Sequence, residues 1–309
     1  MTTRFDLPDP VRRRAEREGP AGEQWLADLD GCVDELAERW ALDVDRVLTG
    51  GTESLVLAVA VDGAPAVLKL GLPGSAHLDV EARILRAADG RGYARCLADD
   101  AGYNATLVER LGAPLASLGL APEAVDEALC EVLGQAWRPA PTDLAVMSGA
   151  DKARWLADYV ERTWRELDAP CPRRVIDRAL AQAREREGAH DPATSVLAHG
   201  DGHALNALLP LDGGPPEAAR FVDPDGLVAE REYDLGILAR EWIDDAYLAA
   251  PARVGGERAA RLARATGTDA AAITAWGDIE RVSSGLACLT VGLDEFGERM
   301  LAAATSLVD

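Results

Sequence analysis

The chain has 309 residues, 48% of them hydrophobic and 28% charged, enough for about two domains with large cores. It contains 32 Lys and Arg residues and 53 Asp and Glu residues, which gives a net charge of −21. This charge disfavours binding to nucleic acid and anionic membranes and favours a cationic partner. No apolar run approaches the roughly 20 residues that span a bilayer, and the N-terminus lacks a basic segment followed by an apolar one, so we expect a cytoplasmic protein.

The first third of the chain predicts a helix followed by strands. From Trp25 to Trp40, apolar residues recur at steps of three and four, the pattern of an amphipathic helix, which Gly31 can interrupt. Residues 54–61 form an almost continuous apolar run, Asp62-Gly63 offers a tight turn, and residues 66–70 are again apolar, which predicts a β-hairpin. The other elements expected here are a helix over 79–88 and a strand over 105–108.

Helical periodicity dominates the rest of the chain. We expect helices over 122–135, 151–167, 173–186, 234–248, 257–265 and 271–289. Two short strand-like stretches, 195–198 and 221–222, interrupt this series, and residues 213–216 have the composition of a hairpin tip. The order of elements predicts an α+β fold with a small β-rich lobe over residues 1–109, which includes a helical N-terminal extension, and a larger helical lobe over residues 110–309.

Both short strands are followed by residues that suit phosphoryl transfer. Asp201 precedes Asn206 by five positions, and Asp223 follows Phe221-Val222. This chemistry needs a carboxylate that receives the proton of the acceptor hydroxyl, and oxygen ligands that hold magnesium on the phosphates. The H-x-D-x-x-x-x-N spacing of residues 199–206 matches the catalytic loop of kinases. We therefore assign Asp201 as the catalytic residue and Asn206 and Asp223 as magnesium ligands.

A second group of candidates lies in the predicted sheet. Lys69 sits inside an apolar strand, where an unpaired ammonium group would be costly, and Glu81 on the next predicted helix can pair with it. In kinases, a strand Lys paired with a helix Glu grips the phosphates that stay on the nucleotide. The loop before the first long strand can turn backbone N–H groups toward phosphates, although glycine pairs before strands also form ordinary turns. The loop residues concerned are Gly50, Gly51, Thr52 and Ser54.

The histidines near Asp201 permit a different chemistry. With Asp201, His199 and His203 form an H-x-D-x-H pattern, which can bind a transition metal in a hydrolase. Catalytic zinc sites usually have further ligands, and the remaining histidines, His77 and His190, belong to no recognisable motif. We therefore favour a packing and hydrogen-bonding role for His199, in which it shapes the loop.

Further acidic residues lie beyond this motif. Asp234 begins a predicted helix, where its carboxylate can cap the first N–H groups, and it can also support the catalytic loop. Glu241, Asp244 and Asp245 follow on the same predicted helix and are candidates for binding a cationic substrate. A solvated helix face explains these three residues equally well.

Together these motifs resemble the aminoglycoside phosphotransferases, which share the protein-kinase-like fold. The likeness is greatest to the branch of streptomycin 6-phosphotransferases and hydroxyurea-resistance kinases, and it covers most of residues 5–245. The matching segments are His199-Gly200-Asp201 with His203 and Asn206, Val222-Asp223-Pro224, Leu227-Val228, Tyr233-Asp234-Leu235-Gly236, Gly22-Glu23-Gln24-Trp25, Arg39-Trp40, the hairpin 51–61, Leu68-Lys69-Leu70 with Pro73, and 107–111.

The resemblance implies a bilobal kinase-like fold and an enzyme that phosphorylates a hydroxyl group with ATP or GTP and Mg²⁺. It implies that Lys69, braced by Glu81, binds the nucleotide phosphates, and that a hinge from Glu109 to Leu111 meets the purine ring. It also implies that an aminoglycoside antibiotic, streptomycin first, is inactivated. We expect a monomer or a weak homodimer.

Three positions depart from the pattern of this family. Gly202 stands where relatives have a larger residue, and Trp137 stands where relatives often have a His. Asp225 adds a carboxylate that can compete with Asp223 for the metal. None of these changes removes a group that the mechanism needs. The alternatives are a kinase for an amino alcohol, a sugar or hydroxyurea, a metal-dependent hydrolase, and a kinase-like binding protein without catalysis.

Overall fold

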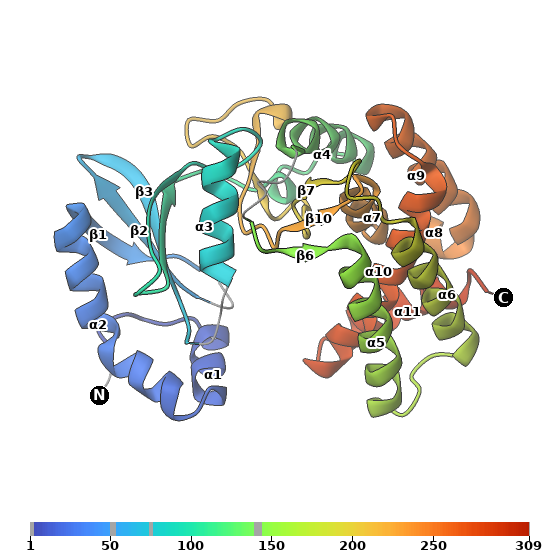
Figure 1. The fold of residues 1–309 in the computed structure, drawn as a ribbon, viewed down its shortest axis with the longest axis horizontal. Coiled ribbons are helices and arrows are strands. Elements are labelled where there is room, and N and C mark those ends of the chain that lie inside the picture. The colour runs from blue at the N-terminus through green and yellow to red at the C-terminus, as the bar shows by residue number, and fades with distance from the viewer. Residues whose placement is uncertain (1–2, 50–53, 74–76, 139–143, 309) are drawn as a thin grey trace. The chain divides into compact units, whose positions relative to one another are not determined.

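The structure is a computed structural model that describes residues 3–49, 54–73, 77–138 and 144–308. The chain divides into two units (Figure 1). Unit 1 consists of Met1–Ala113 and Leu209–Gly214, and unit 2 consists of Pro114–Leu208 and Pro215–Asp309. Among the described residues, no helix combines the length and the apolarity needed to cross a membrane.

Unit 1 contains an antiparallel sheet whose strands follow the order β1-β2-β3-β5-β4. These strands are β1 (Leu42–Val47), β2 (Ser54–Val61), β3 (Ala64–Gly71), β4 (Cys96–Asp100) and β5 (Ala105–Glu109). The predicted hairpin is confirmed, because β2 and β3 pair and are joined at Asp62 and Gly63, whose φ angles of 50° and 79° suit a two-residue turn. The edge strands β1 and β4 have no predicted counterpart, because charged residues interrupt their apolar pattern.

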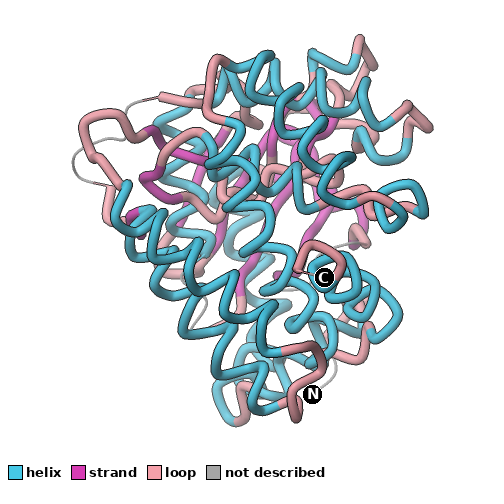
Figure 2. The backbone as a smooth tube through the Cα atoms, turned by 90° about the vertical axis from the view of Figure 1, so that its right-hand side faces the viewer, coloured by secondary structure: helices cyan, strands magenta, loops and turns pink. Residues whose placement is uncertain are grey.

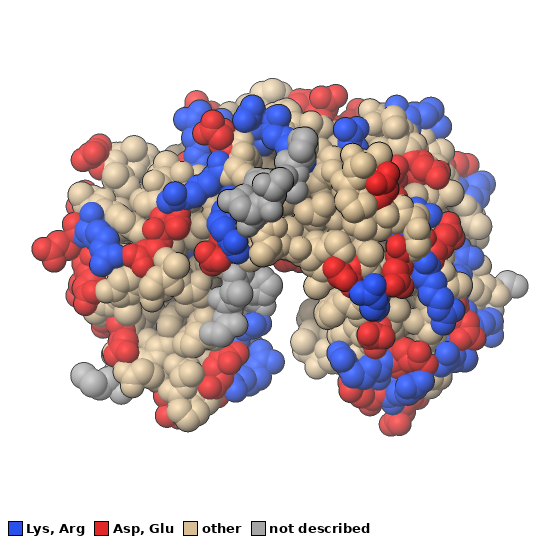
Figure 3. Space-filling model, in the orientation of Figure 1, with Lys and Arg blue, Asp and Glu red and all other residues tan. Residues whose placement is uncertain are grey.

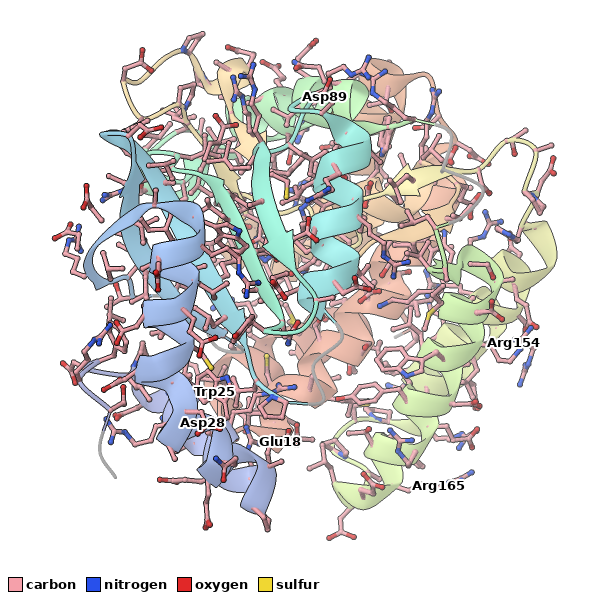
Figure 4. The ribbon with its side chains drawn as sticks, turned by 60° about the vertical axis from the view of Figure 1, so that its left-hand side comes forward. Glu18, Trp25, Asp28, Asp89, Arg154 and Arg165 are labelled. Carbon is pink, nitrogen blue, oxygen red and sulfur yellow. The ribbon has the colours of Figure 1, made fainter. Side chains whose placement is uncertain are left out.

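Helices cover both faces of this sheet (Figure 1). They are α1 (Asp9–Arg17), α2 (Pro20–Trp40) and α3 (His77–Ala88). The apolar side of α2, which Gly31 does not interrupt, packs against the sheet face that carries Leu68 and Leu70. Because side chains alternate along a strand, Lys69 faces the other side, where α3 lies. α1, which was not predicted, packs beside α2 near Trp25 (Figure 4).

Helices dominate unit 2 (Figure 2). They are α4 (Pro122–Ala136), α5 (Gly149–Glu166), α6 (Arg173–Ala189), α7 (Glu232–Arg240), α8 (Asp245–Ala249), α9 (Pro251–Thr266), α10 (Ala270–Thr290) and α11 (Asp294–Thr305), with single 3-10 turns at Leu115–Ser117 and Pro216–Ala218. α10 packs against α5, α6, α7, α9 and α11, and its buried Trp276 and Ile279 join the core. The predicted helices are confirmed except for one, and α11 has no predicted counterpart.

The exception is the predicted helix over residues 234–248, which is wrong. α7 ends at Arg240, because Glu241 is extended, with a ψ angle of 175°, and Trp242 then adopts a left-handed φ angle of 61°. α8 then starts at Asp245, and the carboxylate of Asp244 accepts a hydrogen bond from the Tyr247 N–H at 2.7 Å as its N-cap. The acidic residues of this segment therefore do not share one helix face.

Short strands bring the chemical motifs together within unit 2. They are β6 (Met147–Ser148), β7 (Val196–Ala198), β8 (Ala207–Leu208), β9 (Arg220–Phe221) and β10 (Leu227–Ala229). β7 and β10 pair antiparallel, as do β8 and β9, and β6 runs parallel to β10. Residues 199–206, here called loop A, connect β7 to β8, and residues 222–226, called loop B, connect β9 to β10. Because both pairs of strands are hydrogen-bonded, the two loops lie side by side.

Candidate functional site

Loops A and B are joined directly by backbone hydrogen bonds. The Val222 N–H donates to the Asn206 carbonyl at 2.9 Å, and the Gly226 N–H donates to the His199 carbonyl at 2.9 Å. Both ends of loop A are therefore tied to loop B. The predicted residues Asp201, Asn206 and Asp223, which the chain separates, come together in one small region of unit 2.

Asp234 holds the first residues of loop A in place. Its buried carboxylate accepts hydrogen bonds from the His199 N–H at 3.0 Å, the Gly200 N–H at 2.9 Å and the Trp137 indole N–H at 2.8 Å. The capping role predicted for Asp234 is wrong, because the N-cap of α7 is Arg231 and Asp234 faces donors outside its own helix. Its carboxylate instead binds the backbone of loop A, which is the other position predicted for it.

Trp137 stands where related sequences often have a His, and its contacts show why a Trp fits at this position. It follows α4, is nearly buried, and gives its only side-chain hydrogen-bond donor to Asp234. A His in the same position also carries a ring N–H donor. The change to Trp therefore keeps a donor for the buried carboxylate.

His199 is fully buried, and both of its ring nitrogens make contacts. Nδ1 accepts a hydrogen bond from the Asp201 N–H at 3.1 Å, and Nε2 lies 3.0 Å from the Val222 carbonyl, to which it donates. The ring also packs edge-on against Phe221. Burial lowers the pKa of His199 and keeps the imidazole neutral, although nearby carboxylates oppose the shift.

These contacts argue against the alternative of a transition-metal site. A neutral imidazole offers one lone pair, and in His199 this lone pair already accepts the Asp201 N–H. Among the residues that the structure describes, no group of three or more His, Cys, Asp and Glu side chains is placed to hold a metal ion. His199 instead connects loop A to loop B through its ring.

The Asp201 carboxylate is held between Arg240 and His203. Its Oδ1 lies 3.2 Å from Nη2 of Arg240, its Oδ2 lies 3.2 Å from Nε2 of His203, and its side chain is 35% exposed. Burial by itself would raise the pKa of Asp201, but the hydrogen bond and charge of His203 and the charge of Arg240 hold this pKa well below its usual range. Asp201 is therefore ionised, and its oxygens keep lone pairs for a further donor.

His203 forms the second contact with Asp201. Although burial opposes the charged form, the Asp201 carboxylate raises the pKa of His203 above its ordinary value. The His203 Nδ1 also lies 3.3 Å from the Leu205 N–H, which can donate to it only while Nδ1 carries no proton. Nε2 is then the protonated nitrogen, and it donates to Asp201.

Asn206 and Asp223 have the chemistry of a magnesium site. The Asn206 side-chain nitrogen donates to the Asp201 carbonyl at 3.0 Å, so its amide oxygen is the atom that can ligate a cation. Asp223 is exposed and has a φ angle of 55°, an uncommon value outside glycine. Magnesium typically takes one or two protein oxygens and completes its shell with phosphate and water. The donor set therefore fits this ion.

Gly200 is constrained by both its conformation and its neighbours. Its φ angle is +94°, and a Cβ atom added there would lie 2.8 Å from the Asp225 Cβ. Gly202, by contrast, lacks a positive φ, and an added Cβ would meet its nearest atoms at 3.5 Å, an ordinary contact. Only the first of these two loop A glycines is required by the backbone.

We therefore expect Gly200→Ala to distort loop A and Gly202→Ala to leave it intact. Strained backbone and overpacking each cost roughly 1–3 kcal/mol, so Gly200→Ala should lower the free energy of unfolding by about 2–5 kcal/mol. Gly202→Ala is the matched control and should change it by less than about 1 kcal/mol. Urea unfolding of both variants measures this difference, and equal stability of the two would contradict it.

In unit 1, the predicted partners Lys69 and Glu81 are in contact. The Lys69 ammonium lies 2.6 Å from the Glu81 carboxylate, and both side chains are buried between β3 and α3. Ser54 opens β2, Glu109 ends β5 and accepts the Arg95 N–H at 2.8 Å, and the nearby Leu111 is buried. The remaining loop candidates, Gly50, Gly51 and Thr52, lie outside the described residues.

The acidic substrate candidates occupy three different environments. Glu241 pairs with Nε of Arg240 at 3.1 Å. Asp244 caps α8, and the almost fully exposed Asp245 pairs with Arg299 at 3.0 Å. Of these, Glu241 alone shares a partner with Asp201. That partner, Arg240, was not predicted from the sequence, because a basic residue at a helix C-terminus has an ordinary explanation in the helix dipole.

The comparisons with known sequences agree with these motifs. The profile of the aminoglycoside/hydroxyurea antibiotic resistance kinase family matches residues 39–292. Streptomycin 6-kinase of Streptomyces glaucescens is 32% identical over 281 residues, which cover 88% of this chain and 87% of the relative. Hydroxyurea phosphotransferase of Kitasatospora aureofaciens is 35% identical over 222 residues, 70% of this chain and 62% of the relative.

Solved structures share the fold at lower identity. A mutant aminoglycoside phosphotransferase in complex with ADP and hygromycin B has a TM-score of 0.62 at 15% identity, covering 89% of this chain and 97% of that one. Spectinomycin phosphotransferase in complex with ADP and spectinomycin has a TM-score of 0.58 at 14% identity, with coverages of 88% and 96%. The predicted kinase-like α+β fold and the predicted enzyme class, a phosphotransferase, are thus confirmed. With a profile match over most of its length and a relative above 30% identity, the chain belongs to the aminoglycoside/hydroxyurea antibiotic resistance kinase family.

Proposed function

We propose that this protein transfers the terminal phosphoryl group of ATP or GTP to a hydroxyl group of streptomycin. The observation that carries the proposal is the arrangement of loop A, where the Asp201 carboxylate pairs with Arg240 and the Asn206 side chain binds the Asp201 carbonyl. A backbone hydrogen bond from Val222, the neighbour of Asp223, joins loop B to Asn206. The similarity to streptomycin 6-kinase over 88% of the chain supports the choice of substrate. The net charge of −21 also suits a cationic antibiotic.

The distribution of charged side chains on the molecular surface does not favour an anionic macromolecule as a partner. On the face drawn in Figure 3, Lys and Arg side chains are interspersed with Asp and Glu side chains. A nucleic-acid binder would instead gather its basic residues on one face. A small cationic substrate needs no such surface.

The proposed reaction uses Asp201 to orient the acceptor. Its carboxylate accepts a hydrogen bond from the substrate hydroxyl, whose oxygen bonds to the terminal phosphorus while the bond from phosphorus to the bridging oxygen breaks. The hydroxyl proton passes to Asp201, and the nucleoside diphosphate leaves. Because the transition state is loose, positioning contributes more than basicity, which agrees with the lowered pKa of Asp201.

The other proposed roles concern the nucleotide. Lys69, fixed by Glu81, binds the phosphates that stay on the nucleotide, and the segment from Glu109 to Leu111 meets the purine ring. Asn206 and Asp223 would hold magnesium, which would supply positive charge next to the phosphate oxygens. The loop candidates Gly50, Gly51, Thr52 and Ser54 contact phosphate through their N–H groups.

The test is mass spectrometry of streptomycin incubated with the protein, Mg²⁺ and either ATP or GTP. The proposal expects a gain of one phosphoryl group, seen with the unchanged protein and not with Asp201→Asn. A parallel panel contains other aminoglycosides, hydroxyurea, sugars and amino alcohols. Phosphorylation of hydroxyurea or a metabolite, with streptomycin unchanged, would replace the proposed substrate and keep the enzyme class.

Variants of the buried Lys69–Glu81 pair distinguish an effect on stability from an effect on activity. We expect Lys69→Met to lower the free energy of unfolding by about 3–5 kcal/mol, because it removes the cation from a buried carboxylate. The double variant Lys69→Met/Glu81→Leu should recover most of that stability, since apolar pairs often replace buried ion pairs without loss. Both variants should remain poorly active if Lys69 binds phosphate. Urea unfolding and the KM for nucleotide measure the two effects, and an active double variant would count against the role.

A further inference from the structure

We infer that Arg240 is a positioning residue that fixes the side chain of Asp201, and that Glu280 and Ser284 of α10 fix Arg240 in turn. This inference rests on the proposed function only in treating Asp201 as the residue that orients the acceptor. No residue of this group except Asp201 was singled out by the sequence motifs.

The first support is the set of contacts around the Arg240 guanidinium group. Nη2 lies 3.2 Å from Asp201 Oδ1, Nε lies 3.1 Å from Glu241, and Nη1 lies 3.2 Å from Ser284 Oγ. Nη1 is also 3.8 Å from Glu280 Oε2. Each nitrogen therefore has an acceptor in a different direction. A planar group held at three nitrogens cannot rotate without losing hydrogen bonds.

The second support is that this group is anchored in the core of unit 2. Glu280 is 5% exposed, and its other oxygen accepts a hydrogen bond from the Tyr233 hydroxyl at 2.6 Å. Tyr233 is fully buried, and its ring packs edge-on against Trp276 with 4.9 Å between ring centroids. The contacts therefore run from two buried aromatic rings through Glu280 and Arg240 to the exposed edge of Asp201.

The third support is the position of Arg240 on α7. The same helix carries Asp234, which holds the backbone of loop A through the N–H groups of His199 and Gly200. Arg240, six residues later, holds the side chain of Asp201. One rigid helix thus sets both the path of loop A and the direction of its carboxylate. Such double support suits a group whose placement matters to within about 0.5 Å.

The charges around Arg240 determine what its loss would do. Its guanidinium group faces the carboxylates of Asp201, Glu241 and Glu280, and within these contacts it is the cation that they share. Without it, these carboxylates repel one another at short range, and Asp201 loses the donor on Oδ1. The aspartate side chain is then held by His203 alone and can leave the rotamer that faces the acceptor. A shift of about 1 Å can reduce turnover roughly 100-fold.

The experiment compares Arg240→Ala with Arg186→Ala. Arg186 is a matched control, because its side chain is 10% exposed against 11% for Arg240, and it pairs with Glu230 and Glu185 away from Asp201. We expect Arg240→Ala to lower kcat about 100-fold with a change in nucleotide KM of less than about threefold. Added guanidinium should restore kcat at least about tenfold in this variant and not in Arg186→Ala. Equal losses in both variants, or no rescue of Arg240→Ala, would overturn the inference.

Two further measurements keep the test decisive. If Arg240→Ala does not fold, Ser284→Ala removes one supporting hydrogen bond and Glu280→Gln removes the negative charge beside Arg240, and each should lower kcat about three- to tenfold. Crystal structures of the unchanged protein and the variants report the rotamer of Asp201 directly, whichever acceptor the enzyme uses. An unchanged rotamer would reject the inference. Failure to phosphorylate streptomycin, with a displaced Asp201, would reject only the proposed substrate.

Discussion

Asp201→Asn is expected to lower kcat by about 10²–10⁴-fold, the range typical for loss of a positioned proton acceptor. The amide has nearly the shape of the carboxylate, so the contacts of loop A with Asp234 should persist. It carries no negative charge, and its nitrogen presents hydrogen atoms either to Arg240 or to His203, which are themselves donors. The acceptor hydroxyl then loses its partner. Steady-state kinetics with streptomycin and the better nucleotide measure the loss.

The control for this variant is Asp177→Asn on α6. Asp177 also pairs with an arginine, Arg173, at 2.8 Å, but its side chain is 60% exposed and lies in a surface ion pair. Such pairs contribute little, so kcat should stay within about twofold. Binding of nucleotide to Asp201→Asn, followed by calorimetry, should remain within about threefold of the unchanged protein. Normal turnover by Asp201→Asn would remove Asp201 from the catalytic role.

Asp234→Ala is expected to give the largest loss of stability. Three buried donors, the N–H groups of His199, Gly200 and Trp137, would lose their acceptor together. Each unsatisfied buried donor costs about 1–3 kcal/mol, so the free energy of unfolding should fall by roughly 5 kcal/mol. Because two of these donors belong to loop A, kcat should fall as well. Urea unfolding monitored by tryptophan fluorescence measures the first effect.

Glu232→Ala, on the same turn of α7, is the matched control for Asp234. Glu232 accepts a single hydrogen bond from the Asp269 N–H at 3.0 Å in an exposed position. Water can replace that acceptor, so the loss should stay below about 1 kcal/mol. If Asp234→Ala were no less stable than Glu232→Ala, the three contacts would not support loop A as described.

The local features of this fold could be predicted from the sequence. The hairpin of β2 and β3 follows from two apolar runs around Asp62-Gly63, and most helices follow from their periodicity. The spacing of Asp201 and Asn206 identified loop A, because a short loop fixes its own residues relative to one another. Lys69 and Glu81 could be paired because a lysine inside an apolar strand needs a partner.

Features that depend on long-range contacts could not be predicted. Asp234 meets donors 35 and 97 residues away in the chain, so its local setting predicted a helix cap instead. Arg240 meets Ser284 across 44 residues, and nothing near it in the sequence distinguishes it from a solvated helix end. The end of α7 depends on the extended conformation of Glu241 and the left-handed conformation of Trp242, which a tryptophan rarely adopts. Tertiary packing decides all three.

The division of unit 1 between two distant segments affects the order of folding during synthesis. Residues Leu209–Gly214 belong to unit 1 together with Met1–Ala113. The Gly112 N–H donates to the Leu209 carbonyl at 2.7 Å, and the Leu209 N–H donates to the Ala113 carbonyl at 2.9 Å. At roughly 5–20 residues per second, a ribosome needs about 5–20 s to make the intervening hundred or so residues. The nascent chain therefore carries unit 1 without its last segment while the first half of unit 2 is being translated. Completion of the N-terminal unit depends on a part of the chain that is made after loop A.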